Sequence, residues 1–194
     1  TNTVIVNKPI NEQYPCSLLH WIIGDATRCI VVEYTAAGMQ VFENKLNVLA
    51  NQPGFAYHEE NVRNYIGCSP EVAGPVSWGT AELSPYGSGS GMHGIPGDCY
   101  SPSRFVRAAY HNAFYPRKNT EEENVSRLFH TLASVAMVDG ASKMLDGDFE
   151  ITVYTGGLST RTNTYHYNTY DDPAIKSVAL SKFDATGTEL IEVE

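Results

Sequence analysis

Arg104 occupies a place in the chain where a positive charge is normally unfavourable. A turn at Pro96-Gly97 leads through Asp98 to a helix start at Ser101-Pro102. Arg104 therefore falls in the first helical turn, where the helix N-terminus already carries a partial positive charge. An arginine there suggests an anionic partner, either a carboxylate or a substrate. A solvated surface arginine is the alternative that the spacing leaves open.

Asn51 is a second residue that could do chemistry. It ends a predicted strand, in the segment Val-Leu-Ala-Asn-Gln-Pro at 48–53. A side-chain amide at such a place can donate a hydrogen bond to the oxyanion that develops when an acyl group is attacked. The alternative is a turn asparagine that caps the end of the strand.

Two further features suggest other chemistry. Thr1 could act as an N-terminal nucleophile activated by its own amine, although it could equally be where the sequence simply starts. Residues 89–94 match the G-x-G-x-x-G pattern, but a dinucleotide site needs a helix after it, and Pro96-Gly97 follows instead. We interpret these glycines as a loop that needs positive φ angles or a close approach of backbone.

Histidines and cysteines are not arranged as metal ligands. The six histidines form no H-E-x-x-H pattern, and His20 and His130 are more typical of core or boundary positions. The four cysteines lack C-x-x-C spacing, which argues against a zinc knuckle and against a redox motif. We expect no metal, no cofactor and no disulfide framework, and we expect a reducing, cytoplasmic location. The cysteines are Cys16, Cys29, Cys68 and Cys99.

Composition restricts the class of protein. The 194 residues suffice for one domain, or for a large part of one, and the formal net charge is −9 with 13 scattered basic residues. This charge makes nucleic-acid binding by a basic patch improbable. The chain has no apolar stretch that approaches the roughly 18–20 residues needed to cross a bilayer, so no membrane partner is expected.

The elements that would position these residues follow the order strands, two helices, strands. This order predicts an α+β fold in which helices cover antiparallel sheets, within a single domain portion over residues 1–194. Residues 54–100 are rich in glycine, proline and serine and are expected to form a long structured loop. The predicted strands are 19–23, 28–34, 39–43, 47–50, 149–154, 164–170 and 175–181, and the predicted helices are 102–113, capped by Ser101, and 120 to about 139, opened by a capping box.

Several separated motifs resemble the choloylglycine hydrolase family, which includes conjugated bile salt hydrolases and penicillin V acylases. The resemblance covers essentially the whole chain and is greatest to the bile salt hydrolases of gut Gram-positive bacteria. The motifs that carry it are residues 19–25, 31–33, 48–53, 94–98, 103–105 and 165–170.

The resemblance implies an N-terminal-nucleophile αββα sandwich, of which this chain is the C-terminal portion. The family's nucleophile is a cysteine at the mature N-terminus, whose own amine acts as the base. By motif match, Asn51 would stabilise the oxyanion, and Arg104 would lie beside the nucleophile and help to set the charge of the site. The family usually forms homotetramers.

The resemblance also implies that the nucleophile lies outside these residues, in a segment of on the order of 120 residues before Thr1. None of the four cysteines matches it, so we expect the chain alone to be inactive and to be stable only with that segment. The sequence thus predicts part of a bile salt hydrolase that cleaves glycine- or taurine-conjugated bile acids through a cysteine thioester. A penicillin V acylase, or a non-catalytic remnant acting as a binding or assembly subunit, are the alternatives.

Overall fold

A computed structural model describes residues 19–184, 186–188 and 191–192. The expectations about Thr1 and Cys16 concern positions outside the described residues. Within the described part of the chain, no helix is both long and apolar enough to cross a membrane.

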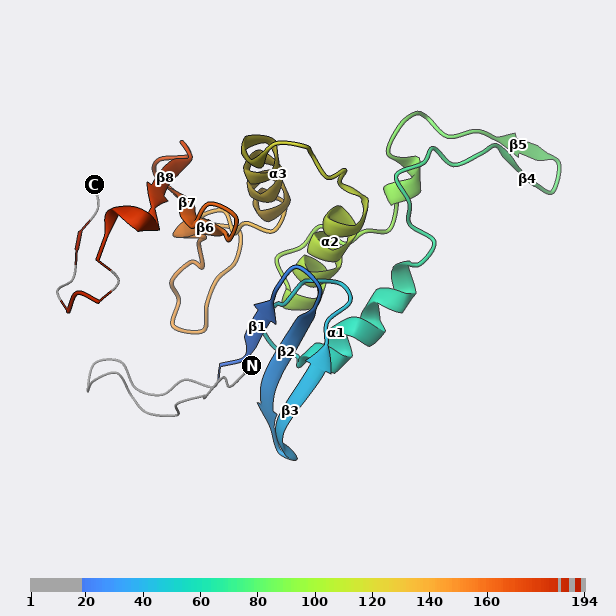
Figure 1. Cartoon of the computed structure of the whole chain (residues 1–194). Helices are drawn as coiled ribbons and strands as arrows, with labels where there is room; N and C mark the ends of the chain where they lie inside the picture. Colours follow the sequence, from blue (N-terminus) through green and yellow to red (C-terminus); the bar gives the residue numbers. More distant parts are fainter. Residues whose placement is uncertain (1–18, 185, 189–190, 193–194) are drawn as a thin grey trace.

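The first sheet is an antiparallel meander of β1 (Trp21–Gly24), β2 (Cys29–Thr35) and β3 (Gly38–Glu43) (Figure 1). The turn before β2 is built by Asp25, whose Oδ1 accepts hydrogen bonds from the amides of Thr27 and Arg28 at 2.7 and 2.9 Å. These bonds and one from the Thr27 hydroxyl hold the pKa of Asp25 below its usual value. The three strands that the sequence predicts for this meander are confirmed by the pairing of β1 with β2 and of β2 with β3.

The fourth strand expected at residues 47–50 is wrong. This segment pairs with no other described strand. Instead, the buried side chain of Asn44 donates from Nδ2 to the Val48 carbonyl at 3.0 Å. An apolar run forms a strand only where a neighbour offers a hydrogen-bonding edge, and the described residues offer none here.

Residues 54–100 contain more regular structure than the sequence indicates. They form α1 (Phe55–Asn61), two short 3₁₀ helices, η1 (Val62–Tyr65) and η2 (Ser90–Met92), and a hairpin of β4 (Val76–Trp78) and β5 (Ala81–Leu83). Figure 1 shows the hairpin projecting away from the rest of the molecule.

The start of α1 is stabilised from outside its own segment. The amide of Phe55 donates to both carboxylate oxygens of Glu33, at 2.9 and 3.1 Å, and Glu33 belongs to β2. No side chain within the helix's own segment caps it. A cap supplied from 22 residues away leaves no local signal, which explains why this helix is missed from sequence.

The two predicted long helices are α2 (Ser101–Phe114) and α3 (Glu121–Ala133). The expected capping box of α3 is confirmed, but this helix ends at Ala133 rather than near residue 139. Ser101 is the first residue of α2 and not its cap. Asp98 organises this helix start, because its carboxylate accepts from the Tyr100 amide and from the Ser103 hydroxyl, both at 2.8 Å.

The hydrophobic core joins the first sheet to α1 and α2. Its aromatic rings form a chain, with centroids of Phe42 and Phe55 5.7 Å apart and those of Phe55 and Phe105 6.3 Å apart. Phe55 and Phe105 are fully buried, so each contributes on the order of 2 kcal/mol from burial. The buried members of this cluster are Val31, Val48, Phe55, Phe105 and Ala109.

The second sheet contains β6 (Tyr154–Ser159), β7 (Thr164–Thr169) and β8 (Lys176–Ala179) in antiparallel order. α3 packs against one face, where Leu128 contacts the glycine at 157. The last two strands confirm the sequence expectation. The strand predicted at 149–154 is wrong, because β6 begins only at Tyr154 and Phe149 forms a single bridge with Lys143.

The glycine-rich segment forms a tight loop, as the sequence predicts. Gly89 and Gly94 have φ angles of +87° and +104°. Gly91 has no room for a side chain, because a Cβ there would lie 2.6 Å from the Ser69 carbonyl oxygen and closer still to that of Glu71. Both expected reasons for glycine therefore occur in this loop.

We expect Gly91→Ala to lower the free energy of unfolding by about 1–3 kcal/mol, because the methyl group meets backbone that cannot rotate away. Gly74→Ala is the matched control, since nothing lies within 4 Å of that position. Urea unfolding of the complete protein checks both variants. Equal stability of the two variants would show that the backbone around Gly91 shifts to admit the methyl group at no cost in free energy.

Candidate functional site

The structure brings together the two residues that the sequence singles out. Nη2 of Arg104 donates a hydrogen bond to Oδ1 of Asn51 at 2.7 Å, across 53 positions of sequence. A guanidinium can only donate, so the oxygen of the Asn51 amide must face it. The two N–H donors of Nδ2 are thereby directed away from Arg104. This is the orientation that a donor to an external anion needs.

Arg104 is itself fixed by the loop before α2. Its Nε donates to the Cys99 carbonyl at 3.0 Å, and its amide donates to the Tyr100 carbonyl at 2.9 Å. The carboxylate partner that its helix position suggested is not found, because Arg104 forms no ion pair within the described residues. Its charge is directed at a neutral amide oxygen instead, and its flat, forked donor group suits this two-sided contact.

The main chain of Asn51 is held as firmly as its side chain. Its carbonyl oxygen accepts from Nε2 of His58 and from Oγ of Ser101, both at 2.8 Å. His58 is fully buried, and its ring stacks on Phe105 with centroids 4.6 Å apart and planes 7° from parallel. Sequence reasoning missed His58, because it lies on the helix that was expected to be loop.

Asn51 and Arg104 open into a hollow of about 660 Å³ beside the start of α2. One wall carries Asp98, whose pKa is lowered by its hydrogen bonds to Ser103 and Tyr100, so the rim holds a carboxylate as well as a guanidinium. The other lining residues are Cys99, Tyr100, Ser101, Met137, Ala141, Ser142 and Glu150.

The residues that line this hollow can supply the electrostatic part of acyl transfer, and the described residues place no activated nucleophile in it. Asn51 can donate to an oxyanion, and Arg104 supplies a positive charge beside it. The thiol of Cys99 lines the hollow but has no hydrogen-bonded base among the described residues. In the same part of the chain, no group of three or more histidine, cysteine or acidic side chains is placed to hold a metal ion.

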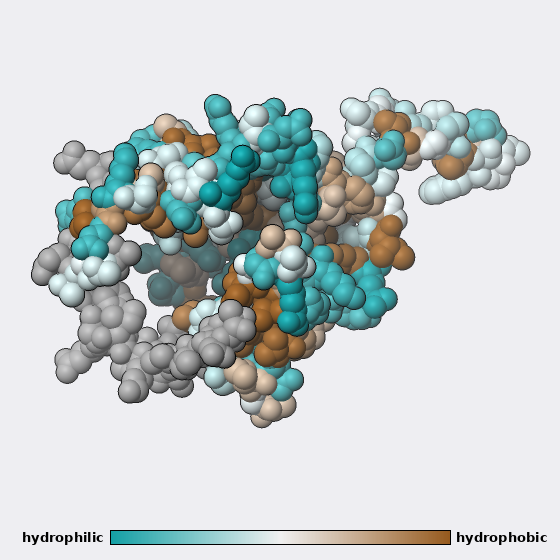
Figure 2. Space-filling view, in the orientation of Figure 1, coloured by the Kyte–Doolittle hydropathy of each residue, from teal (hydrophilic) through white to brown (hydrophobic). Residues whose placement is uncertain are grey.

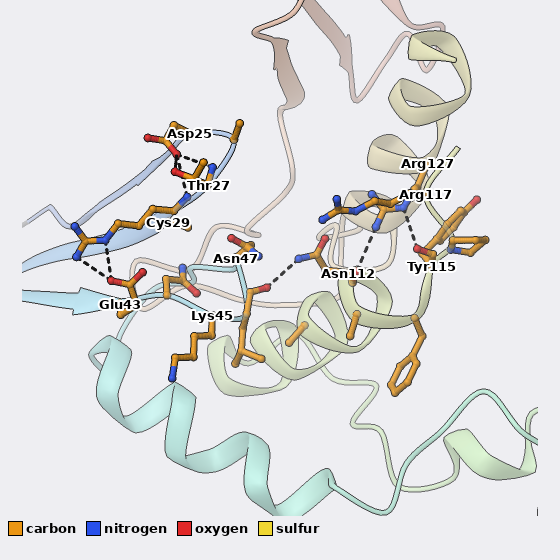
Figure 3. Close-up of a pocket in the computed structure, with 18 residues that line it drawn as sticks. Asp25, Thr27, Cys29, Glu43, Lys45, Asn47, Asn112, Tyr115, Arg117 and Arg127 are labelled. Atoms are coloured by element: carbon orange, nitrogen blue, oxygen red, sulfur yellow. Dashed lines mark hydrogen bonds and ion pairs between the residues drawn. The ribbon is translucent and has the colours of Figure 1, made fainter. Parts of the chain in front are cut away.

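A second hollow, of about 850 Å³, lies between the turn before β2 and the C-terminal end of α2 (Figure 3). Two of its arginines are already engaged: Arg28 pairs with Glu43 at 2.8 Å, and Arg127 donates to the Tyr115 carbonyl at 3.3 Å. Burial and the nearby Glu43 raise the pKa of the Cys29 thiol, which makes it a poor nucleophile. The hollow beside Asn51 is the better candidate site.

Comparison with protein families identifies the chain. The family described as "Linear amide C-N hydrolases, choloylglycine hydrolase family" matches residues 1–192. The chain belongs to the choloylglycine hydrolase family. The chain is 57% identical over 192 residues to "Bile salt hydrolase/transferase" of Bifidobacterium longum. This match covers 99% of this chain and 60% of that protein. It is 40% identical to "Conjugated bile acid hydrolase" of Lactobacillus acidophilus, over 98% of this chain and 60% of that protein.

The chain therefore spans about 60% of the length of these relatives. Among solved structures, a mutant conjugated bile acid hydrolase from Clostridium perfringens matches with a TM-score of 0.83 and 34% identity, over 97% of this chain and 57% of that one. Penicillin V acylase from Agrobacterium tumefaciens matches with a TM-score of 0.65 and 17% identity, over 85% of this chain and 46% of that one. At this low identity, the match shows a shared fold alone. The expected α+β N-terminal-nucleophile hydrolase fold is confirmed.

The contact between Asn51 and Arg104 predicts a measurable coupling. In a double-mutant cycle of Asn51→Ala and Arg104→Met, we expect the two effects on the free energy of unfolding to be non-additive by about 0.5–1.5 kcal/mol. Arg117→Met replaces Arg104→Met in a control cycle, since Arg117 belongs to the other hollow. Additivity in both cycles would mean that the hydrogen bond is not formed in solution.

Proposed function

We propose that this chain is the C-terminal part of a bile salt hydrolase, which cleaves the amide bond between a bile acid and glycine or taurine. The observation that carries the proposal is the Asn51 amide, held by Arg104 with its donors turned away, in a chain of this family. The relatives named for bile salt or bile acid hydrolysis, at 57% and 40% identity, support this choice of substrate.

The reaction begins with attack of a cysteine thiolate on the amide carbonyl carbon. The carbonyl oxygen gains the negative charge, and Nδ2 of Asn51 donates a hydrogen bond to it. Arg104 keeps that amide from turning its oxygen toward the charge. The C–N bond then breaks as the leaving amine takes the proton that the cysteine's own amine removed from the thiol. Water hydrolyses the thioester that remains, releasing the bile acid and regenerating the thiol.

We propose that the attacking cysteine is supplied by the remaining length of the enzyme, as the family resemblance implies. The described cysteines support this, because Cys29 has a raised pKa and Cys99 has no hydrogen-bonded base. The thiols of Cys29 and Cys99 are free, as is that of Cys68, the other described cysteine. Free thiols support the proposed cytoplasmic location. Enzyme activity in the cytoplasmic fraction of the source cells, rather than in the medium, checks the location.

The same remaining length is proposed to cover the open face of the second sheet. The rings of Tyr165 and Tyr167 stack there, with centroids 6.0 Å apart, and α3 covers the opposite face. An apolar hollow of about 950 Å³ lies over them, flanked by Val178 and Leu180. Exposed aromatic and aliphatic side chains gathered in one hollow are typical of a surface that another segment covers. We expect the 194-residue chain alone to bind a hydrophobic dye that the complete enzyme does not bind.

The hairpin of β4 and β5 supports the proposed homotetramer. It extends from the body of the molecule and carries hydrophobic residues on its surface (Figure 2). Trp78 of β4 is 75% exposed, and in the segments that flank the hairpin Ile66 is 84% exposed and Tyr86 is fully exposed. Exposed aromatic residues on a projecting segment are typical of an interface. We propose that this hairpin contacts another copy of the chain.

Turnover of taurine-conjugated bile acid tests the proposed function. The complete polypeptide is expected to release taurine, and Asn51→Ala is expected to lower kcat about 10²-fold or more through loss of an oxyanion donor. Cys99→Ala is the control for the nucleophile and should keep its activity. Phenoxyacetyl amide as the preferred substrate would favour a penicillin V acylase, and no turnover of either substrate would favour a non-catalytic role.

The hairpin proposal predicts a change in assembly. Trp78→Ser combined with Tyr86→Ser is expected to reduce the mass of the complete enzyme from that of a tetramer to that of a smaller species, because the apolar contact is lost. Light scattering after size-exclusion chromatography measures the mass. Leu145→Ser is the control, since Leu145 is an equally exposed apolar residue away from the hairpin. An unchanged mass of the double variant would place the interface elsewhere.

A further inference from the structure

The structure assigns positioning roles to His58 and Ser101, which hold the carbonyl of Asn51 so that its amide is correctly placed for the oxyanion. This inference rests on the proposed function, because it concerns how that same site is kept in its working geometry. Neither residue was singled out from sequence for this role. We call the pair of hydrogen bonds from His58 and Ser101 to the Asn51 carbonyl the carbonyl clamp.

His58 has no other polar task in the described structure. A carbonyl oxygen only accepts, so Nε2 of His58 carries the proton of the 2.8 Å hydrogen bond. The other ring nitrogen, Nδ1, is buried and has no hydrogen-bond partner among the residues that the structure describes. Burying a polar group without a hydrogen bond costs free energy, and an apolar side chain would fill the same place at no such cost. The hydrogen bond to Asn51 is thus what a histidine supplies at this position and an apolar side chain would not.

The ring of His58 is held rigidly enough to transmit a position. It is 0% exposed and lies parallel to the ring of Phe105, at 4.6 Å between centroids. Phe105 is itself a fully buried member of the core. The clamp thus connects Asn51 through one stacked ring to the buried core, which is how a supporting residue fixes the geometry of a site.

Ser101 makes the same connection from the second helix. It is 6% exposed, and its hydroxyl donates to the Asn51 carbonyl rather than capping α2. Asp98 organises that helix start instead, by accepting from the Tyr100 amide and the Ser103 hydroxyl. α2 therefore holds Asn51 twice, through Ser101 on the main chain and through Arg104 on the side chain.

The consequence for catalysis follows from distance. An oxyanion donor acts only within a few tenths of an ångström of its working position, and a displacement of about 1 Å can cost about 10²-fold in rate. Arg104 alone fixes which way the amide faces, but it does not fix where the Asn51 main chain lies. The clamp supplies that second constraint, from α1 and from α2 together.

Two substitutions at His58 separate its hydrogen bond from its packing. His58→Phe keeps a ring against Phe105 and removes the donor, whereas His58→Gln keeps a donor near the position of Nε2 and removes the ring. We expect His58→Phe to lower kcat of the complete enzyme about 10- to 100-fold with KM nearly unchanged, and His58→Gln to recover most of that loss. His130→Phe, on the exposed side of α3, is the control and should leave kcat unchanged.

A role in packing alone gives the opposite order, with His58→Gln the more damaged variant in both activity and thermal unfolding. The Asn51→Ala background gives a second test: if His58 acts through Asn51, adding His58→Phe there should lower kcat no further. An equal further loss in that background would overturn the proposal. We expect Ser101→Ala to lower kcat as His58→Phe does. A rise of kcat of the same size in Ser101→Ala would also overturn the proposal.

A crystal structure of the His58→Phe variant provides a readout that does not depend on activity. We expect Asn51 to shift and its hydrogen bond to Arg104 to lengthen beyond 2.7 Å. An unmoved Asn51 would overturn the carbonyl clamp, whatever the enzyme hydrolyses. Inactivity of the unmodified complete enzyme toward conjugated bile acids would instead contradict the proposed function, so the two failures are distinguishable.

Discussion

The carboxylate of Glu33 is the interaction on which the arrangement of the site depends. It is buried in β2, where it accepts from the Phe55 amide at the start of α1 and from His20 at 2.9 Å. These bonds keep α1 against the sheet, and α1 carries His58 to the carbonyl of Asn51. A buried charge is tolerated only when it is fully hydrogen-bonded. Here that requirement also determines where the helix lies, and through the helix where Asn51 lies.

Sequence reasoning succeeded where the signal is local. The capping box of Thr120 and Glu123 lies within four residues, and it located the start of α3. The sequence does not predict α1, because Glu33 caps it from another element. The apolar residues 47–50 are typical of a strand, but no described neighbour pairs with them. Asn51 and Arg104 were found through residue type and family resemblance. Their contact across 53 positions, and the part played by His58, appear only in three dimensions.

Within the described residues, the chain provides charge and hydrogen-bond donors rather than a nucleophile. Such a division is physically reasonable, because stabilising an oxyanion requires rigid donors whereas forming and breaking a covalent bond requires an exposed, reactive atom. The rigid part is built here from two helices packed on one sheet, with Phe55 and Phe105 between them. The segment that we propose to carry the reactive atom would then meet a surface that is already in place.

The hydrogen bond from Arg104 to Oδ1 of Asn51 also makes the site chemically vulnerable. Loss of the amide nitrogen by deamidation would leave an aspartate whose oxygen still faces the guanidinium, now as a full ion pair. The local structure would be held more tightly than before, while the proposed donor to the oxyanion would be gone. On the function we propose, an aged enzyme would keep its fold and lose its turnover, with a change of about 1 dalton at Asn51 as the only covalent trace.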